Sequence, residues 1–177
     1  QDAIAALNCG GGTGAITFEL DSGTYTGNFV VQGPISGNPS ITITQNGVLG
    51  DVIIQDPTGP TTSSASVIKL NQVSDFSFSN IVFKRNGSAG FGTPSAIIEA
   101  NDGDNIEISQ CRLIGGSGFG TDYSVFFNNT SNSRTIDCFL DGGISGIFYT
   151  SSTQADNNSI FNNRIENLTN SAIQLNN

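Results

Sequence analysis

The stretch Phe76-Ser77-Phe78-Ser79-Asn80-Ile81-Val82-Phe83 decides the fold, because its pattern returns further along the chain as Ile106-Glu107-Ile108-Ser109-Gln110-Cys111-Arg112-Leu113. Both copies alternate apolar and polar residues, pass through one polar residue, and then resume as a second short run. Weaker copies follow at Thr135-Ile136-Asp137-Cys138-Phe139-Leu140 and at Ile160-Phe161-Asn162-Asn163-Arg164-Ile165. Such recurrence at a nearly constant period indicates a repeat architecture.

Two interleaved series share this period. An apolar column runs through Ile54, Phe83, Leu113, Leu140 and Ile165. A second series of segments begins with serine and then turns apolar, at Ser66, Ser95, Ser124, Ser145 and Ser171. No unit has the length or the periodicity of a crossover helix. The sequence therefore predicts an all-β protein, a right-handed parallel β-helix (solenoid) of about six rungs of roughly 25–30 residues each.

A polar residue stands immediately before the last strand of each unit, where the chain must turn a corner. Short amide and carboxyl side chains tolerate the left-handed backbone conformation of a tight corner. Stacked at the spacing of the rungs, they can also hydrogen-bond to one another. We therefore expect a structural ladder formed by Asp51, Asn80, Gln110, Asp137 and Asn162.

The corner column and the serine-led strands resemble the pectin-lyase-like family of parallel β-helices. Residues 15–31, AITFELDSGTYTGNFVV, resemble the opening of secreted β-helix proteins, including pectin methylesterases. They also resemble the N-terminal part of Bacteroidota surface proteins, many of which leave the cell through the type 9 secretion machinery. The resemblance covers nearly the whole chain and implies the fold more specifically than any activity.

The two ends of the predicted rod differ. Residues 1–14 are expected to form an N-terminal cap with a short helix over residues 1–7, stopped by Asn8 and the following glycines. Residues 15–177 are expected to form the rungs of a single domain. The last strand, residues 171–177, is followed by no closing element, although a solenoid needs a terminal cap. We expect the rungs to continue beyond this end in a longer polypeptide, or a partner to cover it.

Composition restricts the class of partner and the compartment. Fifteen acidic residues against six basic ones give a net charge of −9, which argues against nucleic acid and anionic membranes as partners. The apolar runs are too short to span a bilayer. Because the chain starts at Gln1 without an apolar leader, we expect a secreted or cell-surface protein whose signal peptide has been removed; an excised fragment of a longer protein is the alternative.

Catalytic chemistry is poorly supported by the residues. The resemblance implies a catalytic Arg or Lys with calcium-binding carboxylates for lyases, and two Asp with an Arg for methylesterases. Arg112 and Arg164 share one repeat position and should point outward, with Phe139 between them in the column. The chain has no His, which removes the usual base of a nucleophilic triad. No cofactor is expected, with calcium as the alternative.

Calcium would be held by Asp102, Asp104 and Glu107, near the turn Asn101-Asp102-Gly103-Asp104-Asn105. The competing interpretation is an ordinary Asp-Gly turn, because the spacing of a recognised calcium loop is missing. Glu99 follows Lys69 by one period of the repeat, so these two side chains can form an ion pair between rungs.

Cys111 and Cys138 should stack on adjacent rungs. Two reduced thiols are slightly favoured over a disulfide, because in-register neighbours have poor disulfide geometry. Cys9 is expected beneath the cap.

The function that we expect is a non-catalytic module of a larger secreted or surface protein, serving adhesion or carbohydrate binding. Sugar contacts would come from Phe91, Phe119 and Tyr123 on Gly-rich loops, together with Arg112 and Arg164. The alternative for the rings is to fold back over the rod. Two other functions compete: the N-terminal portion of a polysaccharide lyase or carbohydrate esterase acting on acidic polysaccharide, and an exported cargo held by a secretion or assembly complex. The expected partners are a polysaccharide or cell-surface glycan, the rest of a longer polypeptide, and the secretion machinery.

Overall fold

A computed structural model of the chain describes residues 5, 8, 12–57, 66–86, 95–116, 122–152 and 157–176. These residues form 18 strands arranged in three parallel sheets of six strands each. Sheet A contains β1 (Ala15–Leu20), β4 (Ser40–Gln45), β7 (Ser74–Ser79), β10 (Asp104–Ser109), β13 (Arg134–Ile136) and β16 (Ser159–Phe161). Sheet B contains β2 (Gly23–Thr26), β5 (Val52–Gln55), β8 (Val82–Lys84), β11 (Arg112–Ile114), β14 (Phe139–Asp141) and β17 (Arg164–Glu166). Sheet C contains β3 (Phe29–Gln32), β6 (Ile68–Asn71), β9 (Ser95–Asn101), β12 (Asp122–Asn128), β15 (Ser145–Thr150) and β18 (Ile173–Asn176).

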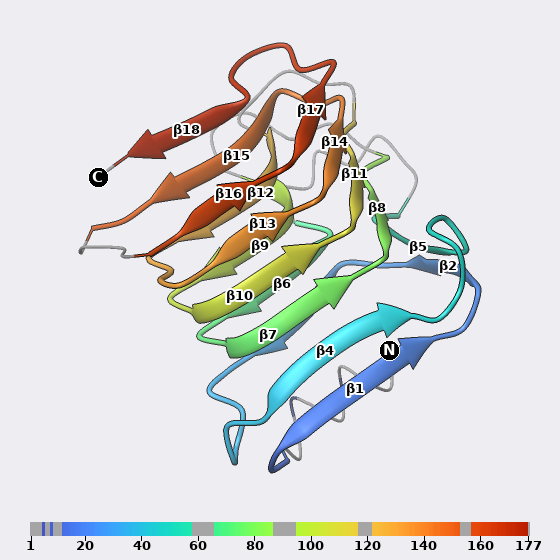
Figure 1. Cartoon of the computed structure of the whole chain (residues 1–177), viewed down its shortest axis with the longest axis vertical. Coiled ribbons are helices and arrows are strands. Elements are labelled where there is room, and N and C mark those ends of the chain that lie inside the picture. The colour runs from blue at the N-terminus through green and yellow to red at the C-terminus, as the bar shows by residue number, and fades with distance from the viewer. Residues whose placement is uncertain are drawn as a thin grey trace.

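The chain visits the sheets in the order A, B, C and then starts again, so that every strand pairs in parallel with the strand three places later (Figure 1). The result is an all-β parallel solenoid of about five turns, with β1 toward one end and β17 and β18 toward the other. We call each set of three consecutive strands a coil. The predicted all-β parallel solenoid is thereby confirmed, with about five turns where the sequence predicted about six rungs.

Alternation along the strands builds the core. In β7, Phe76 and Phe78 are buried while Ser77 and Ser79 face outward, and β10 places Ile106 and Ile108 on them in register. The column predicted from the repeat is confirmed, because Ile54, Phe83, Leu113, Leu140 and Ile165 are successive register partners in sheet B. A parallel stack of this kind buries similar side chains on top of one another coil after coil.

The corner between sheets A and B has the predicted left-handed conformation at four positions. The φ angles are 60° at Asn80, 54° at Gln110, 54° at Asp137 and 52° at Asn162. At the fifth position the left-handed residue is Gly50 instead of Asp51. A side-chain ladder bond joins Asn162 Nδ2 to Asp137 Oδ1 at 2.5 Å. Backbone bonds connect the other corners, such as Asn80 N to Ser109 O at 3.2 Å and Gln110 N to Ile136 O at 3.0 Å.

The serine-led strands share a sheet, but not the register that their spacing predicts. Asp122, rather than Ser124, pairs with Ser95, and Tyr123 pairs with Ser145. The loops between sheets B and C differ in length, so the spacing between the serines reflects loop length as well as strand register. The predicted alignment is therefore wrong around β12.

The helix expected over residues 1–7 lies outside the described residues, apart from Ala5. The elements formed by the described residues are all strands, so the predicted N-terminal helix is not supported. Cys9 lies outside them as well. Within the part of the chain that the structure describes, no helix is long and apolar enough to cross a membrane.

Candidate functional site

The outer face of sheet C carries two neighbouring columns of side chains. In the first column, Val30, Lys69, Glu99, Phe126, Phe148 and Gln174 follow one another in register from coil to coil. The second column lies two residues further along each strand and consists of Gln32, Asn71, Asn101, Asn128, Thr150 and Asn176. The face thus changes along the rod from charged to aromatic, with amides beside both parts.

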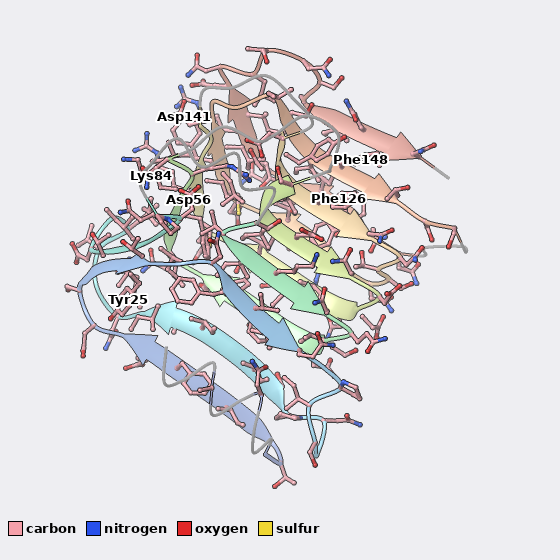
Figure 2. The ribbon with its side chains drawn as sticks, turned by 180° about the vertical axis from the view of Figure 1, so that it is seen from behind. Tyr25, Asp56, Lys84, Phe126, Asp141 and Phe148 are labelled. Atoms are coloured by element: carbon pink, nitrogen blue, oxygen red, sulfur yellow. The ribbon has the colours of Figure 1, made fainter. Side chains whose placement is uncertain are left out.

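Three aromatic rings form a cluster on this face, which we call the aromatic patch: Tyr123, Phe126 and Phe148. Their centroids are 4.8 Å apart for Tyr123 and Phe148, 5.4 Å for Phe126 and Phe148, and 5.6 Å for Tyr123 and Phe126. The ring planes lie within 27° of one another. Figure 2 shows Phe126 and Phe148 together, apart from Lys84 and Asp141. Tyr123 and Phe148 are half-buried, whereas Phe126 is covered.

The tyrosine gives the patch a polar group beside its apolar surface. Partial burial raises the pKa of the Tyr123 hydroxyl above its usual value, so this group stays protonated at neutral pH. A tyrosine that is half-buried in this way offers an apolar ring together with a hydrogen-bonding tip.

Amides of the second column bond to one another along the rod, and we call this set the amide column. Asn71 Nδ2 donates to Gln32 Oε1 at 3.2 Å, Asn101 Nδ2 to Asn71 Oδ1 at 3.2 Å, and Asn128 Nδ2 to Asn101 Oδ1 at 3.1 Å. Asn101 Nδ2 also donates to Glu99 Oε1 at 2.8 Å, which places this column on the same outer face. At the A–B corner, by contrast, the side-chain bond between two of the expected ladder residues is that from Asn162 to Asp137.

The ion pair predicted between Lys69 and Glu99 is confirmed, with Nζ and Oε1 2.8 Å apart. The Glu99 carboxylate also accepts hydrogen bonds from Ser66 and Asn101. Burial alone would raise the pKa of Glu99, but Lys69, Ser66 and Asn101 together hold it below its usual value. Glu99 is therefore a paired, ionised anchor on this face and a poor general acid.

A cluster of buried charges lies at the corner between sheets B and C. Arg85 and Asp122 are joined at 3.0 Å, and their side chains are only 1% and 7% exposed. Arg85 Nη1 also donates to the Ala96 carbonyl at 3.2 Å. Burial raises the pKa of Asp122 to about 6, with the nearby Asp56 carboxylate adding to the rise and Arg85 and Ser95 opposing it. Buried to this degree, Arg85 and Asp122 are poorly accessible to a substrate.

Arg112 and Arg164 project outward from sheet B, as predicted, and enclose a ring. Each guanidinium carbon lies 5.1 Å from the centroid of the Phe139 ring, one on either side along the column. Arg112 pairs with Asp141 at 2.9 Å and Arg164 with Glu166 at 2.5 Å. Hydrogen bonds from Asn167 and Arg112 lower the pKa of Asp141 below its usual value. These arginines are thus on a different sheet from Tyr123.

The three carboxylates proposed for calcium are directed to three different partners. Asp102 accepts from Asn129 at 3.1 Å and Asp104 from Asn132 at 2.8 Å. Glu107 pairs with Arg134 at 3.2 Å. Within the described residues, no three acidic or cysteine side chains gather in a metal-binding arrangement. Calcium binding at these three carboxylates stays a prediction, since the described residues form no preformed metal site.

Phe91 and Phe119 lie outside the described residues. Of the three predicted sugar-binding aromatics, Tyr123 is therefore the one that the structure places. Cys111 and Cys138 are buried free thiols on adjacent coils, as favoured from the sequence. Burial raises the pKa of the Cys111 thiol well above its usual value, which keeps it in the unreactive protonated form.

Sequence reasoning missed the other members of this site. Phe126 and Phe148 lie in apolar strands. Their pairing in register can be recognised only once β12 and β15 have been aligned. The amide column was readable too, because Asn71, Asn101 and Asn128 recur at the period of the repeat. Arg85 follows a strand of sheet B whereas Asp122 begins a strand of sheet C, and no spacing rule connects them.

No known family model matches this chain, and neither does any curated protein. Its likeness to solved structures is one of shape. A candidate glycosyl hydrolase from Parabacteroides merdae superposes with a TM-score of 0.49 and 11% identity, over 92% of this chain and 85% of that one. A pectin methylesterase in complex with a hexasaccharide superposes with a TM-score of 0.51 and 13% identity, over 90% of this chain.

The matched region spans 60% of the pectin methylesterase chain. At such low identity, the likeness concerns the fold alone. The chain described here shares a parallel β-solenoid architecture with the pectin methylesterase.

Proposed function

We propose that this chain is a non-catalytic, carbohydrate-binding β-helix module of a larger secreted or cell-surface protein, and that it binds glycan on the outer face of sheet C. The observation that carries the proposal is the aromatic patch of Tyr123, Phe126 and Phe148, set beside the amide column. The pectin methylesterase that shares the fold was solved with a hexasaccharide, which makes sugar the first class of ligand to test.

The chemistry of the face suits a sugar. A pyranose ring has an apolar face of C–H groups and an edge of hydroxyls, and it needs aromatic carbon opposite the one and hydrogen-bonding groups opposite the other. The half-buried rings of Tyr123 and Phe148 supply the apolar contact. Asn128 and Thr150 lie two residues beyond Phe126 and Phe148 on the same two strands and supply amide and hydroxyl groups. Binding would run along the rod, because both columns do.

Two features favour binding over catalysis within this stretch. The carboxylates beside the face are engaged, as the bonds of Glu99 to Lys69, Ser66 and Asn101 illustrate. Asp122, whose raised pKa of about 6 would otherwise suit proton transfer, is buried against Arg85. A general acid must reach its substrate within hydrogen-bonding distance.

The last coil supports the idea of a module joined to more polypeptide. Ile173 and Leu175 are 46% and 73% exposed, although their register partners Ile147 and Tyr149 are buried. These residues line a pocket of about 460 Å³ together with Tyr149 and Ile160. Exposed apolar surface that continues a buried column is a packing surface for further chain.

Affinity measurements on immobilised polysaccharides test the proposal. The purified chain is passed through gels containing polygalacturonate, xylan, cellulose or no polysaccharide, and its retardation is converted into a dissociation constant. Tyr123→Ala and Phe148→Ala are expected to weaken binding about tenfold each, because an aromatic anchor that is truncated to alanine costs on the order of 1–2 kcal/mol.

Phe161→Ala is the matched control, since Phe161 is an exposed aromatic on sheet A that belongs to no part of the patch. It should bind like the wild type. Equal loss in all three variants would contradict the assignment to sheet C. Release of reducing ends, methanol or unsaturated sugar during the incubation would overturn the non-catalytic part of the proposal and favour the lyase or esterase alternative.

A further inference from the structure

Charged side chains are few on sheet C. Its six strands contain three of them, Lys69, Glu99 and Asp122. Lys69 pairs with Glu99 at 2.8 Å, and Asp122 pairs with the buried Arg85 at 3.0 Å. Among the strand residues of sheet C there is therefore no unpaired cation. The remaining basic residues of the chain lie outside this sheet, at Lys84, Arg85, Arg112, Arg134 and Arg164.

The ion pair between Lys69 and Glu99 lies directly beside the aromatic patch. Lys69, Glu99 and Phe126 are successive register partners in the first column of the outer face. Neighbouring strands of a sheet are about 4.8 Å apart. A sugar that covers the Phe126 end of the patch is therefore one strand away from Glu99 and two strands away from Lys69.

The two members of this pair are exposed to different degrees. The Lys69 side chain is 39% exposed, whereas that of Glu99 is 8% exposed. Hydrogen bonds from Ser66 and Asn101 hold the Glu99 carboxylate in place, and its lowered pKa keeps it ionised at neutral pH. A ligand can thus reach the Lys69 ammonium, but the charge of this ammonium is already balanced by a carboxylate that the ligand does not reach.

We propose that Glu99 is the specificity-determining residue of the sheet C face: by neutralising Lys69 from beneath, it makes this face select neutral glycans and exclude glycans that contain uronates. The inference rests on the proposed function, because it names the class of glycan that the same face would bind. Glu99 acts through Lys69 and not through contact with the sugar.

The physical reason for this selection is the cost of desolvation. A sugar carboxylate that moves from water onto aromatic rings loses hydration, and this loss is offset only where a cation is free to pair with it. Sugar hydroxyls lose less, and the Asn128 amide and the Thr150 hydroxyl beside the patch can replace their hydrogen bonds to water. The net charge of −9 also repels a polyanion at longer range.

Matched pairs of immobilised polysaccharides test the selection. Polygalacturonate is compared with its methyl ester, C6-oxidised cellulose with cellulose, and glucuronoxylan with unsubstituted xylan. The readout is the ratio of the two dissociation constants, acidic over neutral, in each pair with a neutral or acidic member that the wild type binds. The wild type should bind the neutral member about tenfold more tightly or better.

Charge variants assign this ratio to Glu99. Glu99→Gln keeps the shape of the side chain and leaves the Lys69 ammonium without its carboxylate, so the ratio should fall toward one. In the double variant Glu99→Gln/Lys69→Met the cation is gone again, and the ratio should return toward the wild-type value. A mere loss of packing at Glu99 would not be reversed by a second substitution at Lys69.

A control changes the net charge by the same amount on another face. Glu107→Gln frees Arg134, its partner at 3.2 Å on sheet A, and should leave the ratio at the wild-type value. Cooperative thermal unfolding shows that each variant is folded. If Glu99→Gln does not fold, Gln174→Lys takes its place, because it adds an unpaired cation beside Phe148 in the same column and should lower the ratio as well.

The outcomes for the selection and for the proposed function are distinguishable. A wild-type ratio near one, or an unchanged ratio in the folded charge variant, would overturn the role of Glu99 while binding of a neutral glycan leaves the proposed function standing. Tighter binding of the acidic member by the wild type would overturn the neutral class of ligand. If the wild type binds no member of any pair, the proposed function fails and this inference fails with it.

Discussion

The middle coils and the last coil of this rod contain the same columns of side chains in opposite surroundings. Along one inward column of sheet C, Leu70, Ala100, Phe127 and Tyr149 are buried, whereas Leu175, the next member in register, is 73% exposed. The residue type is apolar throughout, so the difference is made by the coil that follows and not by the sequence of the strand. In a solenoid, each coil obtains its stability largely from its two neighbours.

The largest difference between the middle and last coils is expected for a large-to-small substitution in this column. Phe127 is fully buried and its ring lies 4.7 Å from that of Tyr149. Phe127→Ala should lower the free energy of unfolding by about 3–5 kcal/mol, because it removes a large side chain and leaves a cavity. Leu175→Ala should change it by less than about 0.5 kcal/mol. Chemical denaturation of both variants checks this, and equal losses would show that Leu175 is as well packed as Phe127.

A second test contrasts the buried and the exposed carboxylates through pH. Because burial raises the pKa of Asp122 from 3.8 to about 6, the folded state binds this proton more tightly than the unfolded state does. The stabilisation is complete below pH 3.8 and is lost as the pH rises through 6. It amounts to about 3 kcal/mol at most.

The measurement is the unfolding free energy of the wild type minus that of Asp122→Asn, at pH 4.5 and at pH 7.5. The difference should be more favourable to the wild type at pH 4.5. The groups that face Asp122 are Arg85 and Asp56, and both are retained in the variant. Asp141→Asn should behave in the opposite sense, since a lowered pKa stabilises the folded state above the usual pKa and is lost in acid. A pH-independent difference for Asp122→Asn would show that this carboxylate is well solvated.

The amide column provides a smaller effect. Asn101 donates to Asn71 and Glu99 and accepts from Asn128. Asn101→Ala should cost about 1–2 kcal/mol, because it leaves neighbouring polar groups short of a partner. Asn176→Ala, at the exposed end of the same column, should cost less than about 0.5 kcal/mol. Thermal unfolding of the two variants in parallel checks the ordering, which a larger loss for Asn176→Ala would reverse.

The exposed ion pairs of sheet B should matter least. Arg112→Ala removes the contact with Asp141 and one side of the enclosure of Phe139, and should cost about 0.5–1 kcal/mol. The loss should shrink in high salt, which screens such pairs. Arg164→Ala, in the last coil, should have no greater effect. Chemical denaturation of Arg112→Ala at low and high salt checks this. A loss of stability that is the same at both salt concentrations would indicate a packing role of Arg112 instead of an electrostatic one.

Sequence patterns predicted most of the fold where the chain is regular. The column from Ile54 to Ile165, the ion pair of Lys69 with Glu99 and the adjacent thiols of Cys111 and Cys138 all follow from spacings close to one period of the repeat. The left-handed corners followed because only a few residue types tolerate that conformation.

The prediction failed where local rules do not determine the outcome. Alternation alone assigns Tyr123 and Phe126 to opposite faces, whereas their rings stack at 5.6 Å. The buried contact between Asp122 and Arg85 joins residues from adjacent coils at the corner between sheets B and C. The serine register failed for a related reason, since loops between sheets B and C absorb insertions without disturbing the strands. The candidate site therefore depends on tertiary contacts that a repeat pattern does not encode.

The position of a coil along the rod is also expected to determine how often its backbone opens. Strands β16, β17 and β18 have a strand neighbour on one side only, while each strand of the middle coils has one on both. Amide hydrogens of the last coil should therefore exchange with solvent through frequent local opening, and protection should rise toward the middle of the rod. In the isolated chain, fraying would begin at the terminal coils and move inward one coil at a time. The aromatic patch lies one and two coils in from β16, β17 and β18, so further chain packed on this end would lengthen the lifetime of the patch.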